Sequence, residues 1–155
     1  MRVAPTLEGG LRIDADNPHD WLILEMICTD AANMPGKCLP DRLSAFMETD
    51  DDWDEFVTPE LRDQFASQIV HVSKAISSAE KENDLTGSLF IQAADAETWY
   101  GAINQARLSL EAQFRLSNYT DEEEIDEEDT HILAAYVRNQ FYSSMQSILL
   151  EYLIK

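Results

Sequence analysis

Apolar residues recur at helical spacing along much of this 155-residue chain, and this period restricts the fold more than any other feature. In residues 61–79 the successive intervals are four, four, three, four and three, so the apolar side chains share one helical face. They are Leu61, Phe65, Ile69, Val72, Ile76 and Ala79. Thr58 suits the cap of this helix and Pro59 its first position, so we expect the helix to begin there.

An almost continuous apolar block at residues 21–28 predicts a second helix, buried on most of its surface. Asn17 precedes the block as a capping residue, and Pro18 suits the first helical position. The proline and glycine at positions 35 and 36 mark the end of this helix. A shorter helix is expected over residues 41–47, where the apolar side chains lie on one side.

Two more helical stripes occupy the second half of the chain. Residues 99–114 place apolar side chains at intervals of three and four, with Asp95 as the expected cap and Asn118 as the expected end. Residues 132–153 have a broader stripe. A helix that is apolar over so much of its surface belongs in the core.

Two short segments are expected to be extended. Residues 3–14 have the pattern of a hairpin, in which Gly9 and Gly10 supply positive φ for a tight turn. Pro5 confines its strand to the edge of a sheet, because proline lacks a backbone N–H. Residues 86–92 are partly β-branched and bounded by turn residues, which favours a strand.

Together these segments predict a mostly α fold, a single helical domain over residues 1–155. The domain is a bundle of four main helices with one or two short helices. A small β-hairpin or short strands are expected at the N-terminus and around residues 86–92. The acidic residues near 118–128 are expected to form a loop, and a chain of this length can bury a core of its own.

Acidic residues outnumber basic residues by 30 to 11, which gives a formal net charge of −19. The acids are concentrated at residues 50–55 and 121–129. We exclude nucleic acid as a partner, because its recognition needs a basic face that displaces counterions. The charge permits a partner with a basic protein surface or a hard cation, and it favours solubility. The alternative is that both runs are solvated loops, whose carboxylates favour the positive end of the helix that follows.

Composition places the protein in the cytoplasm and not in a membrane. No apolar segment follows the first residues as in a secretory signal. The densest apolar stretches, residues 21–27 and 148–154, are short and each contains a glutamate, so neither can span a bilayer. Cys28 and Cys38 are expected to be reduced, mostly buried thiols, since a zinc site needs more ligands at closer spacing.

Two pairs of polar residues are candidates for small-ligand binding. Glu128 and His131 have the Glu-x-x-His spacing of di-iron bundles, but the sequence contains one copy where such a site needs two. Asn104 and Arg107 share a helical face, and arginine suits a small anion or carboxylate. The alternative for Arg107 is a partly buried side chain that pairs with local carboxylates.

No catalytic signature is present. The sequence lacks a Gly-x-Ser-x-Gly motif and a glycine-rich phosphate loop, so we expect no catalytic residue and no cofactor. Trp53 and Phe56 lie in and just after the first acidic run, where aromatic side chains can anchor a basic peptide. The alternative is that they fasten this loop to the core.

Three short motifs resemble a bacterial family of domains of unknown function, whose genes often neighbour that of the ClpS protease adaptor. The main motif is Trp99-x-x-x-Ile103-Asn104-x-x-Arg107-Leu108-x-Leu110. The others are the residues at 40–43 (Pro-Asp-Arg-Leu) and at 146–149 (Gln-Ser-Ile-Leu). The resemblance implies no activity, and it implies a link to regulated proteolysis.

We therefore expect a non-catalytic module that uses an acidic surface or an apolar groove to hold a protein partner. The competing hypothesis is a small-ligand or metal-dependent enzyme built around Arg107, Glu128 and His131. A third possibility is a homodimer through the C-terminal helix, whose apolar stripe is broader than a simple bundle requires.

Overall fold

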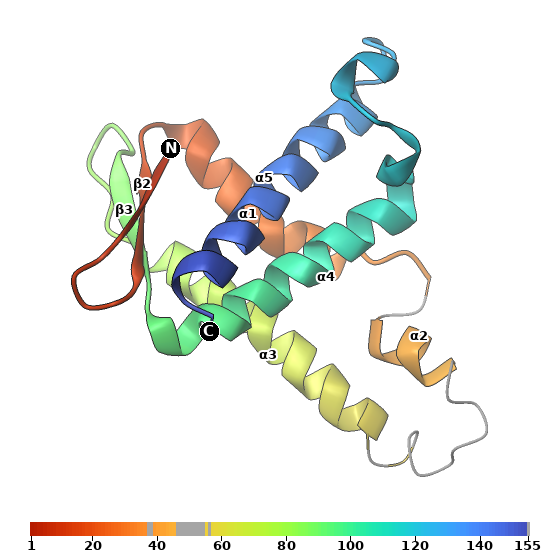
Figure 1. Ribbon diagram of the computed structural model, residues 1–155, viewed down its shortest axis with the longest axis horizontal. Helices are drawn as coiled ribbons and strands as arrows, with labels where there is room; N and C mark the ends of the chain where they lie inside the picture. The colour runs from red at the N-terminus through yellow and green to blue at the C-terminus, as the bar shows by residue number, and fades with distance from the viewer. Residues whose placement is uncertain (37–38, 46–54, 56, 155) are drawn as a thin grey trace.

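The computed structural model describes residues 1–36, 39–45, 55 and 57–154. The fold is mostly α-helical, as predicted, with a small antiparallel sheet to one side of the helices (Figure 1). The helices are α1 (Pro18–Ala32), α2 (Leu39–Ala45), α3 (Thr58–Ser77), α4 (Ala96–Phe114) and α5 (Thr130–Tyr152). The strands are β1 (Arg2–Pro5), β2 (Leu11–Ala15) and β3 (Gly87–Ile91). None of the helices in these ranges is long and apolar enough to cross a membrane.

The sheet has the order β1-β2-β3, with both pairings antiparallel. Val3 pairs with Ile13 and Ile13 pairs with Leu89, so the predicted hairpin is confirmed and the second predicted strand joins it. Gly9 has a φ of +85°, which the turn of the hairpin requires, whereas Gly10 does not have the positive φ that was predicted for it. One face of the sheet is buried against the helices, as the period of two requires, and its side chains are Leu11, Ile13, Leu89 and Ile91.

Helix α1 begins as predicted, because the Asn17 side chain accepts a hydrogen bond from the Asp20 backbone N–H at 3.0 Å, and Pro18 occupies the first turn. The prediction that this helix is buried on most of its surface is wrong. Its core face is Trp21, Leu24 and Ile27, whereas Leu22 is 53% exposed. An apolar block longer than one helical face therefore leaves apolar side chains at the surface.

Two predicted helix ends differ from the structure, whereas the predicted cap position of α4 is confirmed. Helix α3 begins at Thr58, so Val57 occupies the cap position, and the Thr58 hydroxyl has no hydrogen-bond partner among the described residues. Asp95 occupies the cap position of α4, but its side chain does not bond to the helix backbone. Helix α4 ends at Phe114, before the predicted Asn118, because Arg115 adopts a left-handed φ of 49° and stops the helix.

Helix α4 occupies the centre of the bundle. Helices α1, α3 and α5 all pack against it, and α2 packs against α3 (Figure 1). The side chains that α4 buries on these sides are Trp99, Ala102, Ile103, Ala106, Ser109 and Leu110. The predicted stripe of α3 also faces inward, with Val72 and Ile76 fully buried. The last helix forms much of the remaining core, as its broad stripe predicts.

Gly10 provides a test of the packing between the hairpin turn and β3. A Cβ atom at this position would lie 2.5 Å from the Ile91 backbone oxygen, which cannot move without displacing the strand. We expect Gly10→Ala to lower the free energy of unfolding by about 1–3 kcal/mol, as overpacking does in other cores. Urea unfolding followed by circular dichroism measures the change. Glu8→Ala in the same exposed turn serves as control, and an equal effect of the two substitutions would contradict this account.

Candidate functional site

Helices α1 and α5 are joined by a buried polar cluster. Asp30 of α1 is 3% exposed, and it accepts bonds from Arg138 Nε at 2.8 Å and from Arg138 Nη2 at 3.1 Å. The Tyr142 hydroxyl donates to the same carboxylate at 2.6 Å. Burial, and then this bond to Asp30, raises the pKa of Tyr142, so its hydroxyl remains a donor. The carboxylate is thus satisfied by three donors and is not free to act as a general base.

A surface groove lies between α1 and α5 on the N-terminal side of this cluster. Its volume is about 360 Å³ and its walls are mostly apolar. We call it the α1–α5 groove, and it is lined by His19, Leu22, Ile23, Met26, Leu133, Ala134, Val137 and Arg138. Both helices pack against α4, so their outer turns leave a space between them. Leu22 and Val137 are 53% and 46% exposed, which makes the two walls accessible.

The charges beside the groove are negative. Asp129 lies one turn before Leu133 on α5, and Glu25 lies three residues after Leu22 on α1. Neither carboxylate takes part in an ion pair within the described residues. The guanidinium of Arg138 is held by Asp30. The groove therefore has an apolar floor, and the acidic residues Asp129 and Glu25 beside it have no basic partner within the described residues.

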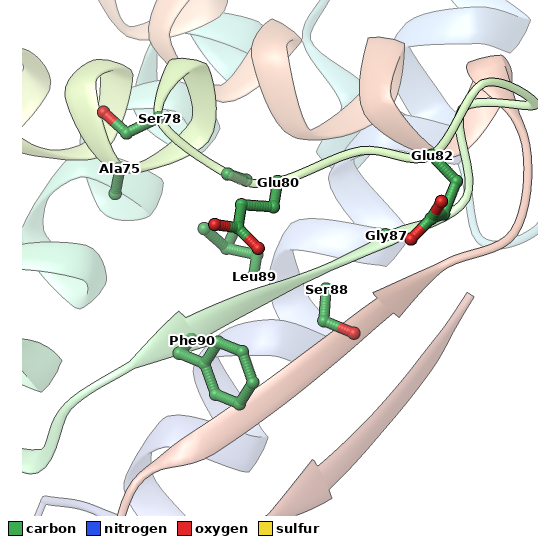
Figure 2. Close-up of a pocket in the computed structure, with 9 residues that line it drawn as sticks. Ala75, Ser78, Glu80, Glu82, Gly87, Ser88, Leu89 and Phe90 are labelled. Carbon is green, nitrogen blue, oxygen red and sulfur yellow. The ribbon is translucent and has the colours of Figure 1, made fainter.

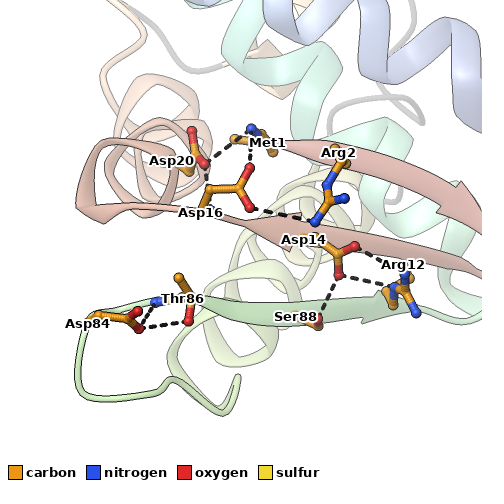
Figure 3. A network of polar contacts seen from close by, with 9 residues as sticks. All are labelled: Met1, Arg2, Arg12, Asp14, Asp16, Asp20, Asp84, Thr86 and Ser88. Carbon is orange, nitrogen blue, oxygen red and sulfur yellow. Dashed lines mark hydrogen bonds and ion pairs between the residues drawn. The ribbon is translucent and has the colours of Figure 1, made fainter.

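A second polar cluster ties the sheet to the start of α1 (Figure 3). Asp14 accepts from the Ser88 hydroxyl at 2.7 Å and pairs with Arg12 at 3.0 Å. The amino group of Met1 lies 3.1 Å from Asp16 and 3.3 Å from Asp20. Each of these carboxylates has a cation or a donor beside it. The cluster is therefore compensated internally and offers no unpaired acid and base for catalysis.

Cys28 has the surroundings of a structural thiol. Its thiol is half-buried beneath α3 and donates to the Ile69 carbonyl, with 3.6 Å between sulfur and oxygen. Burial raises the pKa of Cys28 to about 11, so the thiol stays protonated at neutral pH. Cys38 lies outside the described residues.

Arg107 and Asn104 lie on α4, but they differ in their surroundings. The Arg107 guanidinium donates to Asn139 Oδ1 at 3.3 Å and to Gln146 Oε1 at 2.6 Å, both on α5. Gln146 is buried, and among the described residues its amide nitrogen has no hydrogen-bond partner. Asn104 is exposed. The partners of Arg107 are thus side-chain amides that link α4 to α5, where the sequence had suggested carboxylates.

Glu128 and His131 are both exposed at the start of α5. Asn139, which holds Arg107, is eight residues farther along the helix, or about 12 Å along its axis at 1.5 Å per residue. The three residues of the enzyme hypothesis therefore do not meet at one point. Across the described part of the chain, no group of three or more histidine, cysteine, aspartate or glutamate side chains could hold a metal ion.

The two aromatic candidates of the first acidic run, Trp53 and Phe56, lie outside the described residues. The second acidic run is described, and it contains a short helical turn, Glu122–Glu124, that Asp121 caps through its side chain. Ile125 is buried in the middle of this run and fastens it to the core. The run is therefore an ordered, exposed acidic segment that leads directly into α5.

Comparison with known proteins assigns the chain to a family. The family model described as "Domain of unknown function (DUF2017)" matches residues 37–153, and the chain belongs to this family. The matched residues include α2 to α5 and β3, whereas β1, β2 and α1 precede them. A search of curated proteins found no match, and a search of solved structures found none.

An apolar groove was expected, but neither its position between α1 and α5 nor the buried cluster beside it was predicted from the sequence. The groove could have been expected from the number of apolar residues in α1 and α5, because each helix has more of them than one buried face can hold. No comparable signal in the sequence indicates the cluster. Asp30 is 108 residues from Arg138 and 112 residues from Tyr142, so no local spacing pairs this carboxylate with its donors.

The buried cluster allows a quantitative test. Arg138→Ala would leave the Asp30 charge buried without its cation, so we expect a loss of about 3–5 kcal/mol in the free energy of unfolding. Tyr142→Phe removes one bond to a charged group and should cost about 1.5–3 kcal/mol. Gln140→Ala, exposed on the same helix, should change stability by less than about 0.5 kcal/mol. Denaturant unfolding of the three variants measures these changes. An equal stability of Arg138→Ala and the control Gln140→Ala would contradict a stabilising role of the ion pair.

Asp14 makes a contribution to stability that depends on pH. The hydrogen bond from Ser88, and then the charge of Arg12, lowers the pKa of Asp14 below its ordinary value of 3.8. This contribution is fully present above pH 3.8 and is lost as the pH falls through the lower pKa of the folded state. We expect Ser88→Ala to raise the pKa of Asp14 in an NMR titration. An unchanged pKa in this variant would show that Arg12 alone causes the shift.

Proposed function

We propose that this protein is a non-catalytic interaction module that holds a basic amphipathic helix of a partner protein in the α1–α5 groove. The single observation that carries the proposal is the groove itself, an apolar channel between two exposed helical faces. Exposed, contiguous apolar surface bordered by polar residues is typical of protein interaction sites.

The shape of the groove favours a helix as its occupant. The lining residues on α1, at positions 19, 22, 23 and 26, recur at helical spacing, and those on α5 do so at 133, 134, 137 and 138. Two such parallel ridges form a trough into which the apolar stripe of a third helix can pack. Its side chains at positions i, i+3, i+4 and i+7 would contact Leu22, Met26 and Val137.

The charge favours a basic partner over a second copy of this chain. Two copies would each bring a formal charge of −19, and their acidic margins would lie close together. A partner with lysine or arginine beside its apolar stripe would instead meet Glu25 and Asp129. Homodimerisation through α5 remains a distinct alternative, in which Leu150 and Tyr152, exposed at the other end of the helix, would supply the contact.

The location of the protein and the pathway in which it acts are also part of the proposal. We place the module in the cytoplasm of a bacterium and connect it with regulated proteolysis, which the motif resemblance implied. An adaptor or substrate of that machinery would dock through a basic helix. Titration of purified ClpS adaptor against this protein tests the connection, and absence of binding would remove this partner while leaving the groove open to others.

The groove can be tested with a designed probe. The probe is a peptide of about 18 residues with leucine on one helical stripe and lysine elsewhere. We expect Val137→Glu and Leu22→Glu to weaken its binding about tenfold or more, because each places a carboxylate on the apolar floor. Fluorescence anisotropy with a labelled probe gives the dissociation constants.

Two controls separate the groove from general attraction to an acidic protein. Leu150→Glu adds the same charge to α5 outside the groove, and it should leave binding nearly unchanged. A scrambled peptide has the same composition and charge but no apolar stripe, and it should bind much more weakly. Equal binding of both peptides, or an equal effect of Leu150→Glu, would overturn the proposal. Light scattering of the free protein at high concentration distinguishes the homodimer.

A further inference from the structure

Strand β3 is an edge strand whose outer side is open along its second half. Gly87 pairs with Ala15 of β2 on one side and with Lys81 on the other. The Glu82 backbone N–H donates to the Thr86 carbonyl at 2.8 Å on that second side. The chain segment at Lys81 and Glu82 therefore covers only the beginning of this edge.

The bond between the Glu82 N–H and the Thr86 carbonyl shows in which direction the backbone groups of β3 point. In an antiparallel pair, alternate residues of a strand direct both their N–H and C=O groups toward the same neighbour. Because Thr86 faces away from β2, Ser88 and Phe90 face away from it as well. Phe90 thus makes no bond to β2, and within the described residues no backbone bond joins its N–H or C=O to a segment outside the sheet.

The two edges of the sheet differ in how they resist further pairing. Edge strands are commonly protected by proline or by charged side chains. Strand β1 has both, since Pro5 ends it and Arg2 begins it. Strand β3 is Gly-Ser-Leu-Phe-Ile, with neither a proline nor a charge, and its Phe90 ring is 59% exposed.

A groove of about 550 Å³ runs along this open edge (Figure 2). The last turn of α3 and the segment after it form the opposite wall, through Ala75, Ser78 and Ala79. Glu80 and Glu82 also line the groove, and Figure 2 shows both carboxylates beside β3. Lys81 between them is directed elsewhere, with its ammonium group 4.4 Å from the centre of the Trp21 ring. The charge in the groove is therefore negative.

From this arrangement we infer that β3 accepts an extended, lysine- or arginine-containing segment of another protein as an added strand. The free N–H and C=O of Phe90 would bond to the backbone of this segment, and Glu80 and Glu82 would pair with its basic side chains. Peptide recognition by strand addition gains its affinity from such main-chain bonds. This site lies on the sheet and does not depend on the α1–α5 groove.

Hydrogen exchange of single amides tests the inference with a defined probe. The probe is a seven-residue peptide in which valine and lysine alternate, with blocked ends. In the free protein the amide of Phe90 should exchange much faster than those of Leu89 and Ile91, which face β2. On addition of the peptide the exchange of Phe90 should slow about tenfold or more. Unchanged exchange at saturating peptide would overturn the inference.

Substitutions on both partners identify the bonds. Phe90→Pro removes the outward N–H and should abolish binding, whereas Phe90→Ala keeps that N–H and should retain it. Should Phe90→Pro fail to fold, the same peptide methylated on alternate backbone nitrogens tests the bond without altering the protein. Equal binding of the methylated and unmethylated peptides would overturn the inference.

The charge component has its own matched pair. The double substitution Glu80→Lys and Glu82→Lys should weaken binding of the valine–lysine peptide about tenfold or more. The control Glu97→Lys, at an exposed position on α4, should have little effect on this binding. A peptide with glutamate in place of lysine should not bind. Phe90 amide protection that rises with protein concentration alone would show that a second copy, and not a basic segment, occupies the edge.

Discussion

Helix α4 has to bury side chains on several sides at once, because α1, α3 and α5 all pack against it. Its sequence meets this requirement by combining large residues, such as Trp99 and Leu110, with small ones, such as Ala102 and Ala106, all of which are fully or almost fully buried. Small residues let neighbouring helices approach closely, and large ones fill the space between them. Since α1 and α5 are both positioned by α4, the distance between them is a consequence of that packing. The α1–α5 groove exists because α4 separates its two walls.

The buried carboxylate of Asp30 explains why these two walls keep one relative orientation. Apolar packing alone tolerates rotation and sliding of helices, whereas two bonds from Arg138 and one from Tyr142 reach Asp30 in a single arrangement. A buried ion pair contributes little net stability compared with apolar residues of the same size. Its contribution here is geometric: it fixes α5 against α1 at the end of the groove, next to Val137.

The sequence was sufficient to predict the helices and most of their inward faces, because a period of 3.6 residues is a local property, but it did not predict how the helices pack against one another. It was sufficient for the hairpin as well, because glycine at position 9 has the positive φ that a tight turn needs. It was not sufficient to show which apolar residues stay uncovered. Leu22 and Leu24 are alike in type and two residues apart, yet one is 53% exposed and the other fully buried. Only the positions of the neighbouring helices decide between them, and the partners of Asp30 and the open edge of β3 depend on tertiary structure in the same way.

The large negative charge has one physical role at both proposed binding surfaces, the α1–α5 groove and the open edge of β3: it attracts a basic partner. Long-range attraction increases the rate at which a basic partner arrives, but it does not select where that partner binds. Selection needs short-range features, and these differ between the surfaces: apolar ridges of Leu22 and Val137 in the groove, and free backbone groups of Phe90 at the strand edge. A helical segment satisfies its own backbone bonds and gains nothing from the edge, whereas an extended segment cannot present a helical stripe to the groove. In our proposals, the same acidic chain therefore attracts both kinds of basic segment and separates them by backbone conformation.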